Sequence, residues 1–244
     1  EFEQMEYEFF CKPGDDLNWF KYYQDYAVKF LNDLGLKNDK LRLREHKNEE
    51  LVFYSKATTD IEYKYPHGWG ELWGIADRTD YDLTVHSNHS KNELKYLDPE
   101  TNEKYTPYVI EPSVGCDRLT LAVLCDAYNE ETLEDGSTRE VMKLSPALAP
   151  YKVAVLPLVK KFHKEKAEEI YRMLSKHFMC TYDETGNIGK RYRREDAIGT
   201  PFCITIDDET INNGVVTVRD RDTMAQITLN VDEIVDYINN EIEF

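Results

Sequence analysis

The sequence has few cysteines and no long apolar segment. Its five cysteines are widely spaced over 244 residues and form no Cys-x-x-Cys pair, so neither a disulfide framework nor a zinc site is predicted. No apolar run approaches the roughly 20 residues that a membrane-spanning helix needs, and the first residues do not resemble a signal peptide. We therefore expect a soluble protein of the reducing cytoplasm, with no membrane partner.

Positive charge is also scarce, because the formal net charge is −17. Nonspecific affinity for nucleic acids comes mainly from lysine and arginine neutralising phosphates, so this composition argues against a general nucleic-acid binder. The acidity is uneven, with a net charge of −13 in residues 1–149 and −4 in residues 150–244. The hydrophobic content of 41% is enough for the cores of two ordinary domains.

The periodicity of the first half predicts a sheet and a long helix. Residues 1–10 alternate in polarity and predict a strand, which must pair inside a sheet because an open aromatic edge would aggregate. Apolar residues at helical spacing predict a helix from Asp15 or Asp16 to Gly35. Further strands are predicted within residues 51–65, at 72–76 and at 108–110, followed by a buried helix from about Asp117.

The second half begins with a charged, proline-containing segment at residues 129–150, which predicts a domain boundary between residues 147 and 148. A strand, a helix and a strand then follow in the βαβ order of an α/β domain. The strands are predicted at 153–158, 178–182, 202–206, 215–219 and 225–229, and the helices at 162–177 and 231–242.

Two segments offer groups for binding. Glu6 and Glu8 share one face of the first strand, roughly 7 Å apart, where they either bind an ammonium group or form an exposed polar face; spacing alone favours the second reading. Around Arg118, a strand runs into a helix start, which favours a phosphate site. The alternative is that Asp117 caps this helix and Arg118 pairs with a surface acid.

Other polar clusters have plainer interpretations. His86 and His89, with Asp80 and Asp82 before them, have no third ligand at diagnostic spacing, and we interpret them as polar surface. The basic run at residues 190–194 is typical of a solvated helix face. The tryptophans are expected in the core. Arg219 and Arg221 alternate with acids and are expected to form ion pairs.

Four segments together resemble one family. EPSVGCDR, residues 111–118, is similar to motif 3 of the class II aminoacyl-tRNA synthetases, in the form carried by glycyl-tRNA synthetases. FEQMEYEFF, residues 2–10, resembles the strand after the motif 2 loop of these enzymes. GWGELWGIADRTDYDL at 68–83 and APYKVAVLPL at 149–158 are further matches. The order and spacing of all four span nearly the whole chain, which one chance motif does not do.

The resemblance implies an α/β (α+β) protein with two domains. Residues 1–147 would be part of a class II antiparallel-sheet catalytic domain, and residues 148–244 an α/β anticodon-binding domain with a mixed sheet. The full-length protein would be a cytoplasmic homodimer that activates glycine with ATP and Mg²⁺. It would then transfer the glycyl group from glycyl-adenylate to the 3′ end of tRNA(Gly).

The resemblance also implies the site residues. Glu6 would face the substrate ammonium, and Ser113 would leave no room for a substrate side chain. Glu71 and Arg118 would be catalytic, and Cys116 has no nucleophilic role. The implied glycine-binding residues are Phe2, Glu3, Gln4, Met5, Glu6, Glu111, Pro112, Ser113, Val114 and Gly115. The implied ATP-binding residues are Glu71, Leu72, Gly115, Cys116, Asp117 and Arg118, and no resident metal site is expected.

By the same resemblance, motif 1 and the motif 2 arginine that contacts the ATP α-phosphate are expected ahead of Glu1. A positioned arginine supplies several kcal/mol of transition-state stabilisation, so we expect this chain alone to be inactive. The alternative is a noncatalytic nucleic-acid-binding relative of these enzymes, such as a polymerase accessory subunit. The presence of Glu6, Ser113 and Arg118 disfavours that alternative.

Overall fold

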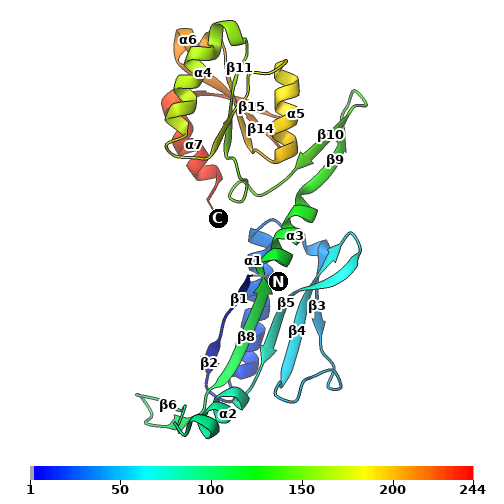
Figure 1. Ribbon diagram of the computed structural model, residues 1–244, viewed down its shortest axis with the longest axis vertical. Helices are drawn as coiled ribbons and strands as arrows, with labels where there is room; N and C mark the ends of the chain where they lie inside the picture. Colours follow the sequence, from blue (N-terminus) through cyan, green and yellow to red (C-terminus); the bar gives the residue numbers. More distant parts are fainter. Residues whose placement is uncertain (1–2, 244) are drawn as a thin grey trace. The chain divides into compact units, whose positions relative to one another are not determined.

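The computed structural model describes residues 3–243 and divides into two compact units, Glu1–Cys125 and Asp126–Phe244. Each unit has its own sheet and its own core (Figure 1). The boundary predicted between residues 147 and 148 lies later than this division. That residues from 148 onward fold as an independent module stays a prediction.

The first unit is built on a six-stranded antiparallel sheet. Its strand order is β1-β8-β5-β4-β3, and β2 pairs with the first half of β8. The predicted N-terminal strand is therefore paired, although it is broken at Tyr7 and Glu8. The strands are β1 (Gln4–Glu6), β2 (Phe9–Cys11), β3 (Leu41–Glu45), β4 (Ala57–Tyr65), β5 (Gly68–Asp77) and β8 (Tyr108–Gly115).

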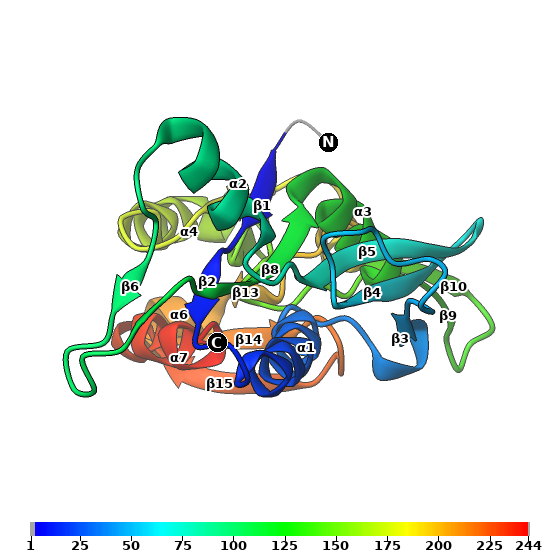
Figure 2. The same cartoon turned by 90° about the horizontal axis from the view of Figure 1, so that it is seen from below.

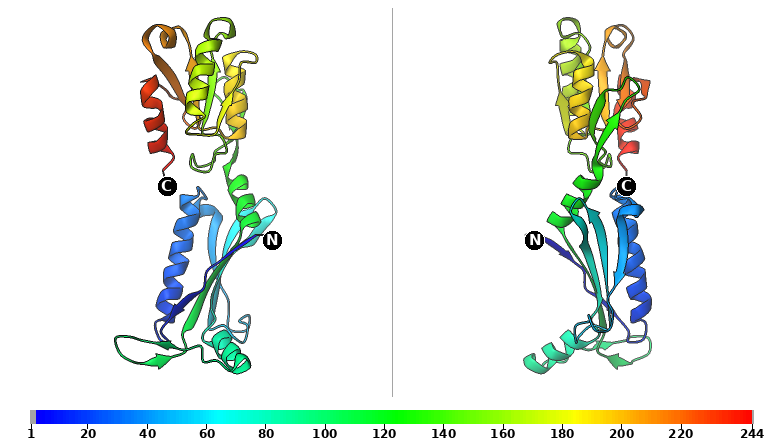
Figure 3. Two further views of the ribbon diagram at one scale, coloured as in Figure 1. Left: turned by 60° about the vertical axis from the view of Figure 1, so that its left-hand side comes forward. Right: turned by 90° about the vertical axis from the view of Figure 1, so that its right-hand side faces the viewer.

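Helix α1 (Asp16–Asp33) covers one face of this sheet (Figure 3). Its buried apolar positions, Phe20, Ala27 and Leu31, follow the predicted stripe, whereas Leu17 is half exposed. The helix ends before Gly35, as predicted, where the backbone is left-handed at φ 99°. The apolar stripe thus fixes which face of the sheet is closed by a helix and which stays open.

Shorter elements lie around the sheet. Helix α2 buries none of its residues. In α3, which was predicted to be buried, Leu121 and Leu124 are 47% and 44% exposed; that prediction was wrong because the helix has an outer face despite its apolar sequence. These elements are η1 (Asn38–Lys40), α2 (Tyr81–Ser90), β6 (Tyr96–Leu97), β7 (Lys104–Tyr105) and α3 (Cys116–Ala127).

The second unit is an α/β layer structure on a mixed sheet of order β12-β11-β13-β14-β15. The first three strands are parallel, and the last two pairings are antiparallel. The predicted strands and the two predicted helices are confirmed, with small shifts at their ends. The strands are β11 (Val153–Pro157), β12 (Cys180–Tyr182), β13 (Phe202–Ile206), β14 (Val215–Asp220) and β15 (Gln226–Asn230).

Helices cover both faces of this sheet (Figures 2 and 3). Side chains of α4 and α7 pack on the face that includes Val153 and Ile204. Side chains of α5 pack on the opposite face against Leu156 and Cys203. The helices are α4 (Lys160–Leu174), α5 (Ile188–Ile198), α6 (Asp208–Asn213), η2 (Val231–Glu233) and α7 (Ile234–Glu241). None of the helices within residues 3–243 combines the length and apolar character that crossing a bilayer requires.

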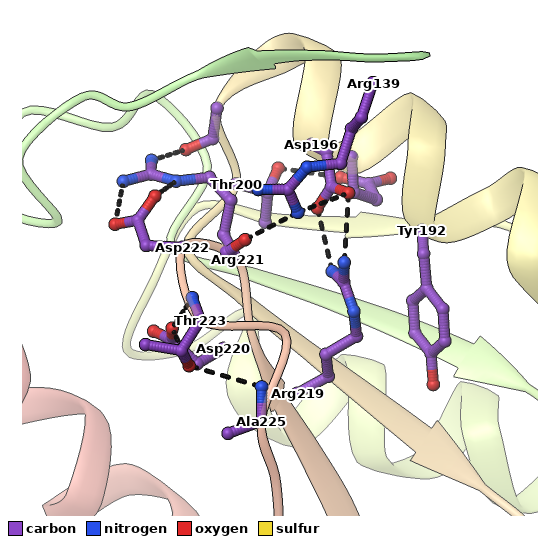
Figure 4. A network of polar contacts seen from close by, with 12 residues as sticks. Arg139, Tyr192, Asp196, Thr200, Arg219, Asp220, Arg221, Asp222, Thr223 and Ala225 are labelled. Carbon is purple, nitrogen blue, oxygen red and sulfur yellow. Dashed lines mark hydrogen bonds and ion pairs between the residues drawn. The ribbon is translucent and has the colours of Figure 1, made fainter. Parts of the chain in front are cut away.

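A hairpin of β9 (Tyr128–Thr132) and β10 (Thr138–Met142) is fixed to the second unit by a buried charge cluster (Figure 4). Asp196 on α5 accepts two hydrogen bonds from Arg219, at 2.8 and 3.0 Å, and one from Arg139 on β10, at 3.3 Å. Arg221 donates to the carbonyls of Gly199 and Leu144 and pairs with Asp222. The ion pairs predicted for Arg219 and Arg221 are confirmed. The pair of Arg219 with Asp196 is buried, whereas Asp222, the partner of Arg221, is 41% exposed.

Gly199 closes α5 directly beneath the end of this hairpin. Its φ of +86° is left-handed, and a Cβ built on it would lie 3.1 Å from both the Cδ1 of Leu144 and the carbonyl oxygen of Met142. No other residue fits this position without moving the chain above it.

Candidate functional site

A polar cavity of about 380 Å³ opens on the face of the first sheet that α1 leaves free. The strands β1, β8 and β5 lie side by side beneath it, and the start of α3 forms one end. Both acidic and basic groups point into it, so it suits a small charged ligand. Its lining includes Gln4, Tyr54, Asp60, Glu71, Gly74, Arg78, Glu111, Ser113, Gly115 and Arg118.

The register of the paired strands places Glu6, Ser113 and Gly74 in one row across β1, β8 and β5. Glu6 pairs with Ser113, and Ser113 pairs with Gly74 on its other side. The amide of Gln4 donates to the Ser113 hydroxyl at 3.2 Å. A Cβ at Gly74 would meet only the Glu71 carboxylate, at 3.5 Å. The row therefore combines a carboxylate with two small residues, and packing does not explain why the second of them is a glycine.

The glycine-site residues predicted from the resemblance divide between the two faces of the sheet. Gln4, Glu111 and Ser113 line the polar cavity. Met5, Pro112 and Val114 alternate with them and line a second cavity of about 530 Å³ against aromatic side chains of α1. Glu6 pairs with Ser113 in register, but it does not line the polar cavity and borders the second one instead. Phe2 lies outside the described residues, and the backbone oxygen of Glu3 accepts a hydrogen bond from Cys116 at 2.9 Å.

Glu111 stands among several charges. Burial raises the pKa of its carboxyl, the neighbouring Arg78 lowers it, and the carboxylates of Glu8 and Glu6 raise it again. The guanidinium of Arg78 lies 2.9 Å from the Glu111 carboxylate. The sequence analysis did not single out Arg78. Its other partner, Asp82, lies four residues later in the first turn of α2, but Arg78 itself precedes that helix, so no helical spacing marks the pair.

Arg118 lies in the first turn of α3, directly after β8, as predicted. Its guanidinium donates to the backbone oxygen of Glu71 at 3.0 Å and lies 3.7 Å from the Glu71 carboxylate. Both side chains stay about half exposed, at 40% and 54%, so they can reach a ligand. Leu72 is 2% exposed, although it borders the cavity. Cys116 and Asp117 begin α3 beside Gly115.

Other sequence interpretations have mixed outcomes. Trp73 is buried, but Trp19 and Trp69 are more than a third exposed, so the prediction of core tryptophans was wrong for these two. The ring of Trp19 contacts Phe9 at a tilted angle, and the guanidinium of Arg42 lies over the ring of Trp69. His86 and His89 lie on α2. Throughout residues 3–243, no three His, Cys, Asp or Glu side chains gather as a metal site.

The basic run at residues 190–194 is not one surface. Arg191 is buried and donates to the backbone oxygens of Pro157, Glu184 and Gly186. Arg194 pairs with Asp183. The solvated helix face predicted there was therefore wrong for Arg191, which holds the loop before α5 to the end of β11.

Sequence comparison finds close relatives along the whole chain. The chain is 65% identical over 244 residues to the glycine–tRNA ligase of Clostridium tetani and 62% identical over 244 residues to that of Geobacillus kaustophilus. It is 60% identical over 243 residues to that of Clostridium acetobutylicum. Each alignment covers 100% of this chain and 52–53% of the relative. The chain thus spans about half the length of the curated relatives it matches.

Two further comparisons concern the fold. Residues 152–241 match the model of the anticodon binding domain, which agrees with the α/β domain expected after residue 148. The prolyl-tRNA synthetase from Cryptosporidium parvum, solved with L-proline and AMP, aligns with a TM-score of 0.67 over 98% of this chain and 50% of that one. At 14% identity this likeness shows the fold, an antiparallel sheet region followed by a mixed-sheet α/β domain.

Proposed function

Since the chain is homologous over its whole length to glycine–tRNA ligases, of which it spans about half, we propose that it is part of an enzyme that charges tRNA(Gly) with glycine. In the first step, a carboxylate oxygen of glycine attacks the α-phosphorus of ATP and pyrophosphate leaves. In the second, a ribose hydroxyl at the tRNA 3′ end attacks the carbonyl carbon of glycyl-adenylate and AMP leaves.

The row of Glu6, Ser113 and Gly74, with Glu111 beside it, is the observation that carries this proposal. Two carboxylates suit the substrate ammonium, because hydrogen bonds from an ammonium group to a carboxylate are charge-assisted and stronger than those to a neutral acceptor. The small side chain at Ser113 and the absence of one at Gly74 leave space for an α-carbon without a substituent. A larger amino acid would have to displace the sheet backbone or the Gln4–Ser113 hydrogen bond.

ATP would lie toward the start of α3. Arg118, which is 40% exposed and donates to the backbone oxygen of Glu71, would meet the nucleotide, and the positive end of the α3 dipole favours negative charge. Mg²⁺ would arrive with ATP, bound mainly through the phosphates.

The remaining parts of the proposal concern partners and setting. The second unit would bind the anticodon end of the tRNA, in keeping with the domain model that matches residues 152–241. The full-length protein would act as a homodimer in the cytoplasm.

Pyrophosphate exchange into ATP, measured on the full-length protein with glycine or alanine, tests the reaction. We expect exchange with glycine and at least a hundredfold less with alanine, because one extra methyl group meets Ser113 and Gly74. Replacing Ser113 with valine should lower kcat/KM for glycine by roughly a hundredfold, since a catalytic pocket that loses an exact fit loses about 1–3 kcal/mol or more. Exchange that does not depend on glycine would refute the proposal.

A further inference from the structure

We propose that the carboxyl groups of Asp16 and Asp77 share one proton, and that this pair is a latch which holds the start of α1 against the end of β5 and loosens when the proton leaves. Asp16 is the first residue of α1, and Asp77 is the last residue of β5. Both are 0% exposed. Asp77 alternates along β5 with Trp73 and Ile75, which belong to the core beneath α1. The pair therefore lies on the covered face of the sheet, and the inference does not depend on the proposed function.

The charges around the pair do not balance. Lys56, directly before β4, is the cation that acts on both carboxyls, and its Nζ donates to the Oδ2 of Asp16. The ring of Tyr108, at the start of β8, lies 5.9 Å from the same Nζ. Cys11, at the end of β2, is 6% exposed beside the two acids. One lysine cannot neutralise two carboxylates, and like charges in a buried site do not both ionise freely.

The hydrogen bonds indicate which carboxyl takes the proton. The Oδ1 of Asp16 accepts from the N–H of Gly14 at 2.8 Å, and its Oδ2 accepts from Lys56. The Oδ1 of Asp77 accepts from the N–H of Thr79 at 3.0 Å, but its Oδ2 is buried without a hydrogen-bonding partner among residues 3–243. A charged oxygen in that position is costly. A proton there removes the charge, and the new O–H can donate toward Asp16.

The pKa values of the acids separate in the same sense. Burial, and then the Asp16 carboxyl, raise the pKa of Asp77 to about 6, while Lys56 opposes this shift. Burial also raises the pKa of Asp16, but the bonds with Lys56 and Asp77 bring it below its ordinary value. The thiol of Cys11 stays protonated at neutral pH, because burial and three neighbouring aspartates, Asp15 included, raise its pKa to about 11. In mildly acidic solution the pair thus holds one proton, on Asp77.

The pair joins two turns of the chain. The turn from β2 into α1 has a left-handed backbone at Gly14, φ +101°, and the carboxylate of Asp16 closes it. Within the described chain, the N-cap residue Asp15 makes no side-chain capping bond, so the first turn of α1 relies on Asp16. The partner strand β5 is paired on both sides, with β4 and β8. When Asp77 loses its proton, the start of α1 is therefore the side that moves away.

Hydrogen exchange of the 244-residue chain, followed by mass spectrometry from pH 5 to pH 7, tests the latch. Asp77→Asn imitates the protonated acid at every pH, and Lys56→Met removes the cation. Asp25→Asn is the matched control, because Asp25 lies on the same helix but is 66% exposed and pairs with Lys21. In wild type, the carboxyl carbon of Asp77 is titrated by NMR, which locates the proton directly. Thermal unfolding checks that each variant is folded.

The wild-type carboxyl carbon of Asp77 should titrate near pH 6. Exchange at residues 14–20, corrected for its intrinsic pH dependence, should become about tenfold faster between pH 5 and pH 7, because local opening releases the proton. In Asp77→Asn this change should stay below twofold, and Asp25→Asn should follow wild type. In Lys56→Met the change should move to higher pH, because Lys56 favours the ionised form of Asp77.

Three results would overturn the inference. An Asp77 carbon that titrates at its ordinary pKa of about 3.9 would show that no proton is shared. Titration near pH 6 with constant protection of residues 14–20 would show that the proton holds nothing in place. The wild-type pH dependence in Asp77→Asn would assign the opening to another group. The NMR titration needs wild type alone, so it decides the first point even where a variant does not fold.

Discussion

The two units bury charged side chains in opposite ways. In the second unit, the carboxylate of Asp196 accepts from Arg219 and Arg139, and Arg139 also donates to the carbonyl of Arg221 and pairs with Glu131. In the first, Glu111 has one cation against the influence of two other carboxylates, and Asp77 and Asp16 share Lys56. Buried carboxylates that have enough cationic partners, here called matched, hold secondary-structure elements together. Buried carboxylates that lack them, here called unmatched, either face a ligand or lower the stability of the fold.

The largest effect is expected from breaking the matched cluster. Replacing Asp196 with alanine leaves Arg139 and Arg219 buried without their shared carboxylate, which should lower the unfolding free energy of the second unit by about 3–5 kcal/mol. Urea unfolding of the whole chain followed by far-UV circular dichroism measures this. Asp222→Ala is the control and should cost about 1 kcal/mol or less, because Asp222 is 41% exposed and Arg221 keeps two carbonyl partners. Equal losses in the two variants would contradict the comparison.

An unmatched carboxylate should make the first unit sensitive to pH. Burial, and then the nearby Asp16 carboxyl, raise the pKa of Asp77 from 3.8 to about 6, so the folded state holds a proton that the unfolded chain has already lost. This contribution is fully present below pH 4 and is lost as pH rises through 6, a change of about 3 kcal/mol. Asp16, whose pKa is lowered, acts in the opposite sense at more acidic pH.

Asp77→Asn isolates this contribution, because asparagine resembles the protonated acid and can still accept from Thr79. The stability of the variant relative to wild type should increase by about 3 kcal/mol between pH 4 and pH 7. All three tryptophans, Trp19, Trp69 and Trp73, belong to the first unit, so their fluorescence follows its unfolding. A difference that is constant across this range would show that the pKa of Asp77 is ordinary.

Gly74→Ala is expected to change stability least of these substitutions. It should nevertheless change the glycine kinetics, so stability and activity should differ most in this variant. Alanine there meets only Glu71 and should leave stability unchanged or raise it by about 0.5–1 kcal/mol, since glycine weakens a strand. The new methyl group enters the cavity beside Ser113, so the glycine KM should rise several-fold. Gly70→Ala is the comparison, because its Cβ would press on the Tyr65 ring at 3.3 Å and should cost stability. Unchanged glycine kinetics in Gly74→Ala would place the substrate elsewhere.

Much of the fold could be predicted because its signals are local. The apolar stripe of α1 and the βαβ pattern that starts at Val153 are periodicities that any core on one face imposes. The hairpin β9–β10 falls in the segment predicted as a domain boundary, because most of its residues are polar or charged. What holds it is Arg139, whose partner Asp196 lies 57 residues later, and no local pattern announces such a pairing.

The candidate site shows the same limit. The resemblance supplied Glu6, Glu111, Ser113 and Arg118 together, but it also supplied Met5 and Val114, which the alternation of strands puts on the far face. Arg78 was missed because its importance depends on strand register: Glu111 is its neighbour only once β5 and β8 are paired. Charges that meet across strands are fixed by tertiary structure, which short sequence spacings do not encode.

Gly199 places a constraint on how this sequence can drift. A methyl group there would lie 3.1–3.2 Å from atoms of Met142 and Leu144, so any other amino acid needs a shift of the hairpin end by a few tenths of an ångström in addition to a strained left-handed backbone. The Met142 atoms that a side chain at position 199 would meet are its backbone oxygen and its Cβ, so replacing Met142 with another residue that has a Cβ does not relieve the contact. We therefore expect Gly199 to vary little among natural sequences, while the loops around the hairpin diverge.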